Sequence, residues 1–376
     1  MIRREGHGVY TAVSARPPDA LALLQTAGLG DFQLSPAWFD NFARTVDLAG
    51  AQPEFHTWHQ HGRLLALLPL LARPGGVSGL GNYYTTRWAP LLAEHLDDAL
   101  AADSLEALLR GLLKHRGPHT LRLGPLQADS REEGLLAAAL RRVGCAVWPL
   151  HAFQNWTLAV DTASPSPWPA YLAARDGRLR STITRMGKRF AGQGGRLELL
   201  QGRHSLDAGI AAYEAVYAAS WKQAEPHPSF MPGVIRAAAD QGCLRLGLAW
   251  LGQEPVAAQV WMVSGGRADI YKLAHDEAHK DTSPGTLLTA RLMQHVFEVD
   301  RVEVVDYLSG DDAYKRLWMA QSRERRSLLA YNLRHPRGLA LAGLQALGVG
   351  TRHGLARLRG GGSPGSGSSG HGEVPA

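Results

Sequence analysis

One stretch of the chain, residues 269–318, constrains the fold more than any other. Residues 269–274 have the aromatic and β-branched content of a strand, and residues 301–308 are typical of a second strand. Between them, apolar side chains recur at helical spacing: Leu287, Leu288, Leu292, Val296 and Val299. A helix between two strands forms a crossover, so we expect a strand–helix–strand unit whose strands are parallel.

The loop before the predicted helix contains Ser283, Pro284 and Gly285. Ser283 is placed to cap the helix, Pro284 suits its first turn because it has no N–H to lose, and Gly285 lets another molecule approach the backbone. The free N–H groups and the dipole of such a helix N-terminus favour an anion such as a phosphate. The same residues also suit an ordinary strand–helix connection, so the loop alone leaves both interpretations open.

Polar side chains gather where the second strand is predicted to end: Asp306, Asp311, Asp312, Tyr314 and Lys315. Ligands bind at strand ends in sheets of this kind, which favours a functional site here. The alternative for Asp311 and Asp312 is a turn followed by a helix cap.

Length and composition favour two globular domains, because the chain has 376 residues, 45% hydrophobic and 20% charged. The three prolines of residues 161–169 indicate a linker. The predicted parts are an N-terminal domain at 1–160, a linker at 161–170, a C-terminal domain at 171–333, and an amphipathic segment with a disordered Gly/Ser-rich tail at 334–376.

The motifs YKLAHD, SPGTLL and VVDYLSGDDAYKRLW resemble the second half of FemAB-like members of the GNAT acyltransferase superfamily, especially the group similar to the CelD cellulose-biosynthesis acetyltransferase. The resemblance extends weakly over most of residues 30–333. It implies an α/β (α+β) fold of two tandem GNAT-like domains, each a mixed, largely antiparallel twisted sheet flanked by helices. It also implies that the C-terminal domain holds the acyl donor, with the N-terminal domain as scaffold and acceptor side.

In GNAT proteins the loop before the third helix holds the pyrophosphate of coenzyme A, and residues 281–286 match that position. The resemblance therefore implies acetyl-CoA or another acyl-CoA as donor substrate. The implied cofactor-binding residues are Ser283, Gly285, Thr286 and Leu287. The usual glycine-rich consensus is reduced here, and Fem-type relatives use aminoacyl-tRNA instead. Tyr314-Lys315 matches an aromatic–Lys pair whose lysine lies at the active site of Fem-type enzymes.

Acyl transfer from a thioester to an amine requires a neutral nucleophile, a stabilised oxyanion and a protonated leaving thiolate. The candidate catalytic residues are Lys315, Asp306, Tyr271, Tyr314, Asp311 and His275. Asp306, Asp311 or His275 could accept the proton of the acceptor. Lys315 could stabilise negative charge or bind a phosphate of the substrate, and Tyr271 or Tyr314 could donate to the thiolate.

The candidate substrate-binding residues come from a basic helix, a glycine-rich loop, and the two positions Trp221 and Gln259. A helix near residues 178–190 buries an apolar stripe and presents cations, and in Fem-type proteins a similar helix contributes to phosphate binding; a merely solvated basic face is the alternative. A glycine-rich loop at residues 75–90 offers aromatic rings and a guanidinium, or else packs on its own domain. The candidates are Arg185, Lys188, Arg189, Tyr84, Arg87, Trp221 and Gln259, with Tyr83 and Trp88 in the same loop.

Net charge of +6 and a pI near 9.4 favour an anionic partner: a nucleotide, coenzyme, tRNA or lipid surface. Two isolated cysteines indicate neither a disulfide framework nor a zinc site, and no metal is expected. Without a signal peptide or an unbroken apolar run, the chain is predicted to be cytoplasmic. An apolar-basic helix at residues 339–358 could contact the inner face of the membrane peripherally, or could simply dock on the protein.

The predicted function is N-acyl (acetyl) transfer from acyl-CoA to an amino group, on a small molecule or nucleotide-linked sugar that serves as a polysaccharide or cell-envelope precursor. One alternative is a Fem-type, aminoacyl-tRNA-dependent transferase. The other is a tandem-GNAT binding protein without catalytic activity. The residues do not specify the acceptor or the acyl chain length.

Overall fold

A computed structural model describes residues 5–11 and 17–359, and the predicted Gly/Ser-rich tail from residue 360 lies outside the described residues. The strands are β1 (Gly6–Tyr10), β2 (Gln52–Gln60), β3 (Arg63–Arg73), β4 (Gly76–Gly79), β5 (Leu91–Leu92), β6 (Thr120–Gln127), β7 (Cys145–Ala159), β8 (Gly195–Leu200), β9 (Leu244–Leu251), β10 (Glu254–Ser264), β11 (Arg267–His275), β12 (Val304–Ser309) and β13 (Gln321–Asn332).

The α-helices are α1 (Pro18–Gly30), α2 (Pro36–Thr45), α3 (Asp98–Arg116), α4 (Arg131–Arg142), α5 (Pro167–Ala173), α6 (Gly177–Gly192), α7 (Leu206–Ala218), α8 (Phe230–Asp240), α9 (Pro284–Glu298), α10 (Ala313–Trp318) and α11 (Pro336–Arg359). Two 3-10 helices are η2 (Phe32–Leu34) and η3 (Glu277–Thr282). Among these described helices, none has the combination of length and apolar character needed to span a membrane.

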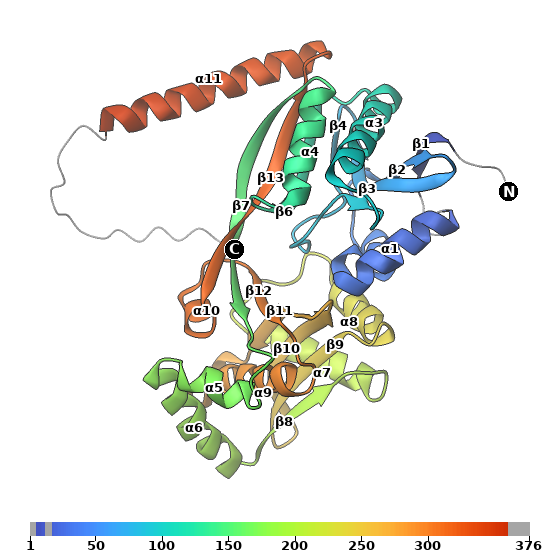
Figure 1. The fold of residues 1–376 in the computed structure, drawn as a ribbon. Helices are drawn as coiled ribbons and strands as arrows, with labels where there is room; N and C mark the ends of the chain where they lie inside the picture. The colour runs from blue at the N-terminus through green and yellow to red at the C-terminus, as the bar shows by residue number, and fades with distance from the viewer. Residues whose placement is uncertain (1–4, 12–16, 360–376) are drawn as a thin grey trace.

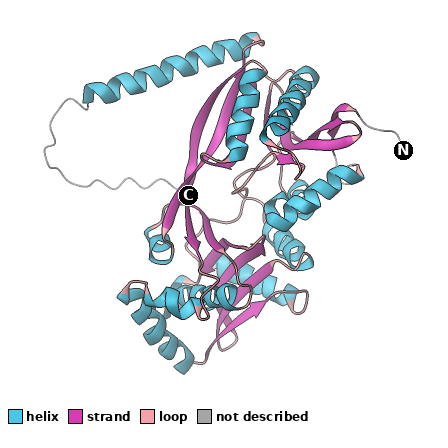
Figure 2. Ribbon diagram, in the orientation of Figure 1, coloured by secondary structure: helices cyan, strands magenta, loops and turns pink. Residues whose placement is uncertain are grey.

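All these strands belong to one mixed, mostly antiparallel sheet in the order β1-β2-β3-β4-β6-β13-β7-β12-β11-β10-β9-β8, with β5 beside β3. Helices flank the sheet along its length (Figure 2). The predicted α/β class, with a twisted mixed sheet covered by helices, is confirmed. The sheet is continuous, however, because β7 pairs with β13 along one edge and with β12 along the other (Figure 1).

Strand β13 comes from the end of the second half of the sequence but lies between β6 and β7 of the first half. An apolar core also joins the halves. Trp38 of α2 meets Phe230 of α8 edge-on, with ring centroids 5.4 Å apart, and both side chains are fully buried. The two halves thus share both a sheet and a core. The domain boundaries at residues 160 and 170 remain predictions.

The strand–helix–strand unit predicted from residues 269–318 is present as β11, α9 and β12. The two strands pair in parallel, as the crossover requires. Pro284 occupies the first turn of α9, as expected. The predicted cap is wrong: Ser283 makes no side-chain capping bond, because its backbone is left-handed (φ 52, ψ 44) whereas a capping residue normally has extended angles.

Candidate active site

Strands β11 and β12 separate at their carboxyl ends. Their register covers three residue pairs and ends at Asp269↔Asp306, although β11 continues to His275. Beyond that pair β12 has an irregularity, with Leu308 at φ 54, and then pairs with β7 through Ser309. The edge of β11 after Asp269 is thus left without β12 as a partner, immediately before the chain turns into η3 and α9.

The first turn of α9 has no side-chain cap, and Gln259 of β10 hydrogen-bonds to it. The Nε2 group of Gln259 donates to the Gly285 carbonyl oxygen at 3.0 Å and to Thr289 Oγ1 at 2.8 Å. Trp261 Nε1 donates to Gln259 Oε1 at 2.9 Å. Gln259 was predicted to bind the substrate, but it is buried, and its hydrogen bonds orient the start of α9 instead.

The predicted cofactor-binding residues divide between the surface and the core. Ser283, Gly285 and Thr286 are half-buried at the start of α9, and their position leaves the first N–H groups of the helix unpaired within the helix. Leu287 is 5% exposed and packs in the hydrophobic core, where it also approaches Gly187 of α6. Its predicted contact with the cofactor is therefore corrected to a packing role.

His275 lies beside the α9 terminus. A Cβ atom added to Gly285 would meet His275 Nδ1 at 3.5 Å, and the imidazole ring lies 4.6 Å from the ring of Trp221. Burial lowers the pKa of His275 from 6.5, although Glu277 at 3.4 Å acts in the opposite direction. The ring is neutral at pH 7, so His275 can accept a proton there.

Tyr314 and Lys315 belong to α10, which follows β12. Tyr314 Oη lies 3.2 Å from Thr289 Oγ1, one turn into α9, and burial raises the pKa of Tyr314. Lys315 Nζ donates to the Ser309 carbonyl and lies 3.5 Å from Asp312 Oδ2. Burial lowers the pKa of this lysine. Tyr314 thus contacts the first part of α9, whereas Lys315 binds the turn that follows β12, and the catalytic roles of both residues remain predictions.

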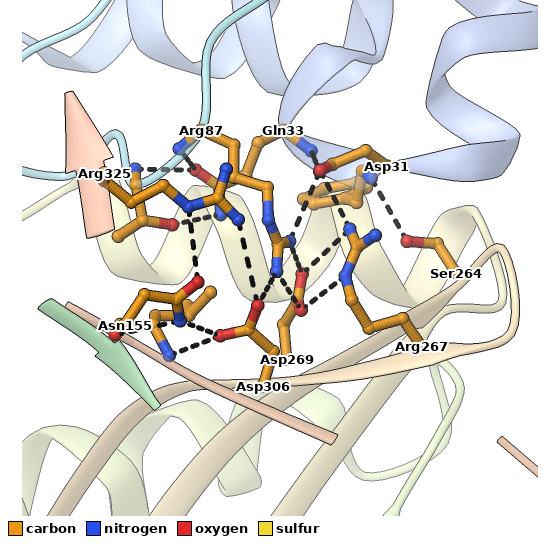
Figure 3. A network of polar contacts seen from close by, with 12 residues as sticks. Asp31, Gln33, Arg87, Asn155, Ser264, Arg267, Asp269, Asp306 and Arg325 are labelled. Carbon is orange, nitrogen blue, oxygen red and sulfur yellow. Dashed lines mark hydrogen bonds and ion pairs between the residues drawn. The ribbon is translucent and has the colours of Figure 1, made fainter. Parts of the chain in front are cut away.

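A buried network of charged and polar side chains joins β11 and β12 to Asp31, Arg87 and Asn155 (Figure 3). Arg87 donates to Asp269 Oδ2 at 2.5 Å and to Asp306 Oδ2 at 2.5 Å, and Asp31 lies 3.3 Å from the same guanidinium. Asn155 Nδ2 donates to Asp306 Oδ1 at 2.5 Å. Arg87 and Asp306 are therefore bound to each other inside the protein, which argues against their predicted roles in substrate binding and proton transfer.

Arg267 and Arg325 flank Arg87 in this network. Burial acts to raise the pKa of Asp269, but Arg87 and Arg267 overcome it and hold that pKa at about 2. Burial, with repulsion from Arg87, lowers the pKa of Arg325 to about 10. The charges compensate one another, so the network fixes β11 and β12 at the pair where they begin to separate.

Tyr84 and Tyr271 are also committed to structure. Tyr271 donates its hydroxyl hydrogen to the Tyr84 carbonyl oxygen at 2.9 Å, and the Tyr84 ring stacks on Phe230 at 3.9 Å. Burial raises the pKa of both phenols. The predicted roles of Tyr271 as a proton donor and of Tyr84 as a substrate contact are replaced by packing between the two halves.

Trp88 is buried and donates to the Pro69 carbonyl oxygen at 2.7 Å, so it packs within the protein, while the remaining candidates are at the surface. Asp311 is exposed, and hydrogen bonds from Trp156 Nε1 at 2.8 Å and from Arg316 lower its pKa, so it stays ionised. Arg185, Lys188 and Arg189 are exposed on α6. An open hollow of about 400 Å³ on this helix is lined by Gly177, Arg180, Ser181, Thr184 and Arg185.

The sequence analysis missed two lysines near Trp221 and His275. Lys272 of β11 pairs with Glu225 at 2.9 Å, and Lys222 lies beside the predicted substrate residue Trp221. Neither lysine belongs to a recognisable motif. The only signal was the proline-rich loop that contains Lys222 and Glu225.

One group among the described residues could hold a metal ion: Glu254, Asp276 and His279, whose ligand atoms lie within 4.8 Å of one another. It lies at the β9–β10 turn and η3. His279 Nδ1 is already hydrogen-bonded to Asp276 at 3.2 Å, and Glu254 is exposed. We assign it no role in the reaction.

Comparisons with known proteins identify one matching domain model and several structures of similar fold. Residues 177–316, which contain β11, α9 and β12, match the family described as the acetyltransferase (GNAT) domain. FemX has a similar fold, with a TM-score of 0.59, 13% sequence identity, and coverage of 85% of this chain and 97% of that chain. A search of the curated proteins found no match.

Two further structures share the fold. One is the C-terminal domain of a putative lysylphosphatidylglycerol synthetase from Agrobacterium fabrum, with a TM-score of 0.51, 13% identity, and coverage of 88% of this chain and 96% of that chain. The other is L-PGS from Bacillus licheniformis, with a TM-score of 0.50, 13% identity, and coverage of 87% and 96%. Residues 177–316 thus match the acetyltransferase (GNAT) domain model, and the chain as a whole shares its fold with FemX and with these two structures.

Proposed function

We propose that the protein transfers an acyl group, acetyl in the simplest case, from acyl-CoA to an amino group of a sugar-containing precursor of a polysaccharide or of the cell envelope. The observation that carries this proposal is the uncapped N-terminus of α9, which stands where β11 and β12 separate, inside the segment that matches the GNAT family.

The donor site follows from backbone chemistry. Free N–H groups near Gly285 and Thr286, together with the dipole of a 15-residue helix, suit the pyrophosphate of coenzyme A. The edge of β11 beyond Asp269 has no partner from β12, and a free strand edge can hydrogen-bond an extended chain of amides such as pantetheine. The thioester would then reach the region of His275.

The side chains supply the proton transfers. As the acceptor amine attacks the thioester carbonyl, a C–N bond forms and the C–S bond breaks. His275 is neutral at pH 7 and receives the amine proton. Tyr314, whose hydroxyl lies 3.2 Å from Thr289 Oγ1, protonates the departing thiolate. The proposed donor is a cytoplasmic metabolite, so we place the reaction in the cytoplasm.

Calorimetric titration with acetyl-CoA tests the donor site. The Cβ atom of a Glu at position 285 would meet His275 at an ordinary contact distance of 3.5 Å, and its carboxylate would compete with the pyrophosphate that is proposed to bind there. We expect Gly285→Glu to weaken binding by about 100-fold or more, equivalent to about 3 kcal/mol. Gly134→Glu is the matched control, because this helical glycine faces open space on α4.

The control should bind acetyl-CoA as the wild type does. Equal binding by wild type and Gly285→Glu, or no binding of acetyl-CoA or any longer acyl-CoA by wild type, contradicts the proposed donor site.

An aminoacyl-tRNA donor is the second candidate, favoured by the exposed cations of α6 and by the net charge of +6. Helix α6 contacts α9, so a polyanion on α6 would lie near the same terminus. This candidate predicts tRNA binding that weakens steeply with salt and no binding of acyl-CoA. A protein without catalytic activity would bind a ligand but show no turnover with either donor.

A further inference from the structure

Two lysines share one tyrosine ring near the proposed active site. Lys222 Nζ lies 5.8 Å from the centroid of Tyr217, and Lys272 Nζ lies 5.9 Å from the same centroid. Lys272 also lies 4.7 Å from the ring of Tyr83, and Lys222 lies 5.7 Å from the ring of Trp221. The loop after α7, the middle of β11 and the loop after β4 therefore converge on one cationic cluster.

The cluster carries more positive than negative charge. Of its two lysines, Lys272 pairs with Glu225 at 2.9 Å. Lys222 Nζ has no ion pair or hydrogen bond within the described part of the chain. Lys222 is only partly accessible, and its ammonium is surrounded by rings and by like charges. One cation is thus left without a counter-charge in a partly desolvated position, which costs free energy unless an anion binds.

The titration of Lys222 agrees with this geometry. Burial, followed by repulsion from Lys272, lowers the pKa of Lys222 to about 8, although Glu225 acts to raise it. An ammonium that is held among like charges in this way gains from a bound anion.

Exposed aromatic rings flank the same cluster. Tyr83 is 63% exposed and Trp221 is 52% exposed, which is unusual for large aromatic side chains. Ring faces beside an ammonium suit a ligand that joins a flat or ring-shaped group to an anion. Trp221 also contacts His275 at 4.6 Å, so a ligand between these rings would lie next to the proposed proton acceptor.

We propose that Lys222 and Lys272, flanked by Tyr83 and Trp221, bind the phosphate of the acceptor, which is accordingly a phosphorylated sugar. This inference rests on the proposed function, since it identifies the chemical class of the acceptor in that reaction. A sugar monophosphate and a nucleotide-linked sugar share the chemistry of a phosphate ester beside a ring. The amine would lie on the side of His275.

Calorimetry on the full chain tests the site with three probes: glucosamine 6-phosphate, UDP-glucose and glucosamine. We expect at least one phosphorylated probe to bind and glucosamine to bind at least about tenfold more weakly, since a charge-assisted hydrogen bond contributes about 1.5–3 kcal/mol. The probe that binds more tightly identifies the source of the phosphate. Lys222→Met should weaken that binding by about 10- to 100-fold, and Lys222→Arg should restore most of it.

Lys114→Met is the matched control, because Lys114 is exposed on α3 and should not affect binding. The inference is overturned if neither phosphorylated probe binds, if Lys222→Met binds as the wild type does, or if Lys114→Met weakens binding equally. Acetyl-CoA titrations of the same variants separate this result from the donor site. Retained acetyl-CoA binding without phosphate binding contradicts the acceptor class and leaves the proposed function in place.

Discussion

Arg87 holds together three buried carboxylates from distant parts of the chain. It bridges Asp269 of β11 and Asp306 of β12, the last pair before these strands separate, and it also contacts Asp31. Two carboxylates facing each other across a parallel pair would repel without this cation. The guanidinium therefore stabilises the point at which the proposed donor site opens.

Replacing Arg87 should destabilise the fold. In Arg87→Met the carboxylates lose a buried counter-charge, and we expect the free energy of unfolding to fall by about 3–5 kcal/mol in urea denaturation. Arg110→Met is the control, because Arg110 makes an exposed pair with Glu106 worth at most about 1 kcal/mol. Equal stability of the two variants would show that the network contributes little.

The same network predicts how stability depends on pH. The pKa of Asp269 is about 2 in the folded protein and near 3.8 in an unfolded chain. Its contribution to stability is therefore complete above about pH 4 and is lost as the pH falls toward 2. Urea denaturation across this range should show a steeper loss in wild type than in Asp269→Asn, which has already lost the titrating group. Parallel curves for the two proteins would contradict the assignment.

His275 carries the proton transfer in the proposed reaction. Its pKa lies below 6.5, so kcat/KM should be constant around neutral pH and fall only under acidic conditions, where the imidazole becomes protonated. We expect His275→Gln to lower turnover by about 10²- to 10⁴-fold and to remove this acidic limb, while acetyl-CoA binding is unchanged. An unchanged pH profile in the variant would assign the proton acceptor elsewhere.

At the scale of elements, the strand–helix–strand unit was predictable because its signal is local: the period of the apolar residues changes within one short stretch. Ser283 was wrongly predicted as a cap because its left-handed backbone depends on the preceding η3 turn. The pairing of Arg87 with Asp306 spans 219 residues, and no local pattern records it. The sequence analysis predicts a catalytic role for Asp306 and a substrate contact for Gln259, because the partners that bury these side chains lie far away in the sequence.

The lysine cluster shows the same limit. Lys222, Lys272 and Glu225 come together only when the loop after α7 folds over β11. By contrast, Tyr314, Lys315 and His275 were identified by their place near strand ends, which is a property of sequence order and topology. Sequence order therefore indicates the region of the proposed site, and the fold determines which polar side chains lie in that region.

At the scale of the molecule, α11 projects from the end of the sheet (Figure 1). Leu339, Leu344 and Leu347 are exposed by 58%, 67% and 70%, and residues 334–359 contain arginines but no acidic residue. An apolar and basic helix of this kind suits the surface of an anionic membrane. We propose that α11 makes the peripheral membrane contact predicted from the sequence.

Sedimentation with vesicles tests this contact. The full chain should bind vesicles that contain phosphatidylglycerol, less so at high salt, and should not bind phosphatidylcholine alone. Removal of residues 336–376 should abolish vesicle binding without changing acetyl-CoA affinity. If the truncated and full chains sediment equally, α11 has no such role.

The central claim is that the N-terminus of α9 binds the donor. A crystal structure of the protein with coenzyme A measures this most directly. Our account predicts that the pyrophosphate accepts hydrogen bonds from the N–H groups at Gly285 and Thr286, with the pantetheine chain along β11 beyond Asp269. A structure in which coenzyme A binds elsewhere, and in which other parts of the protein cover the N-terminus of α9, would contradict this claim.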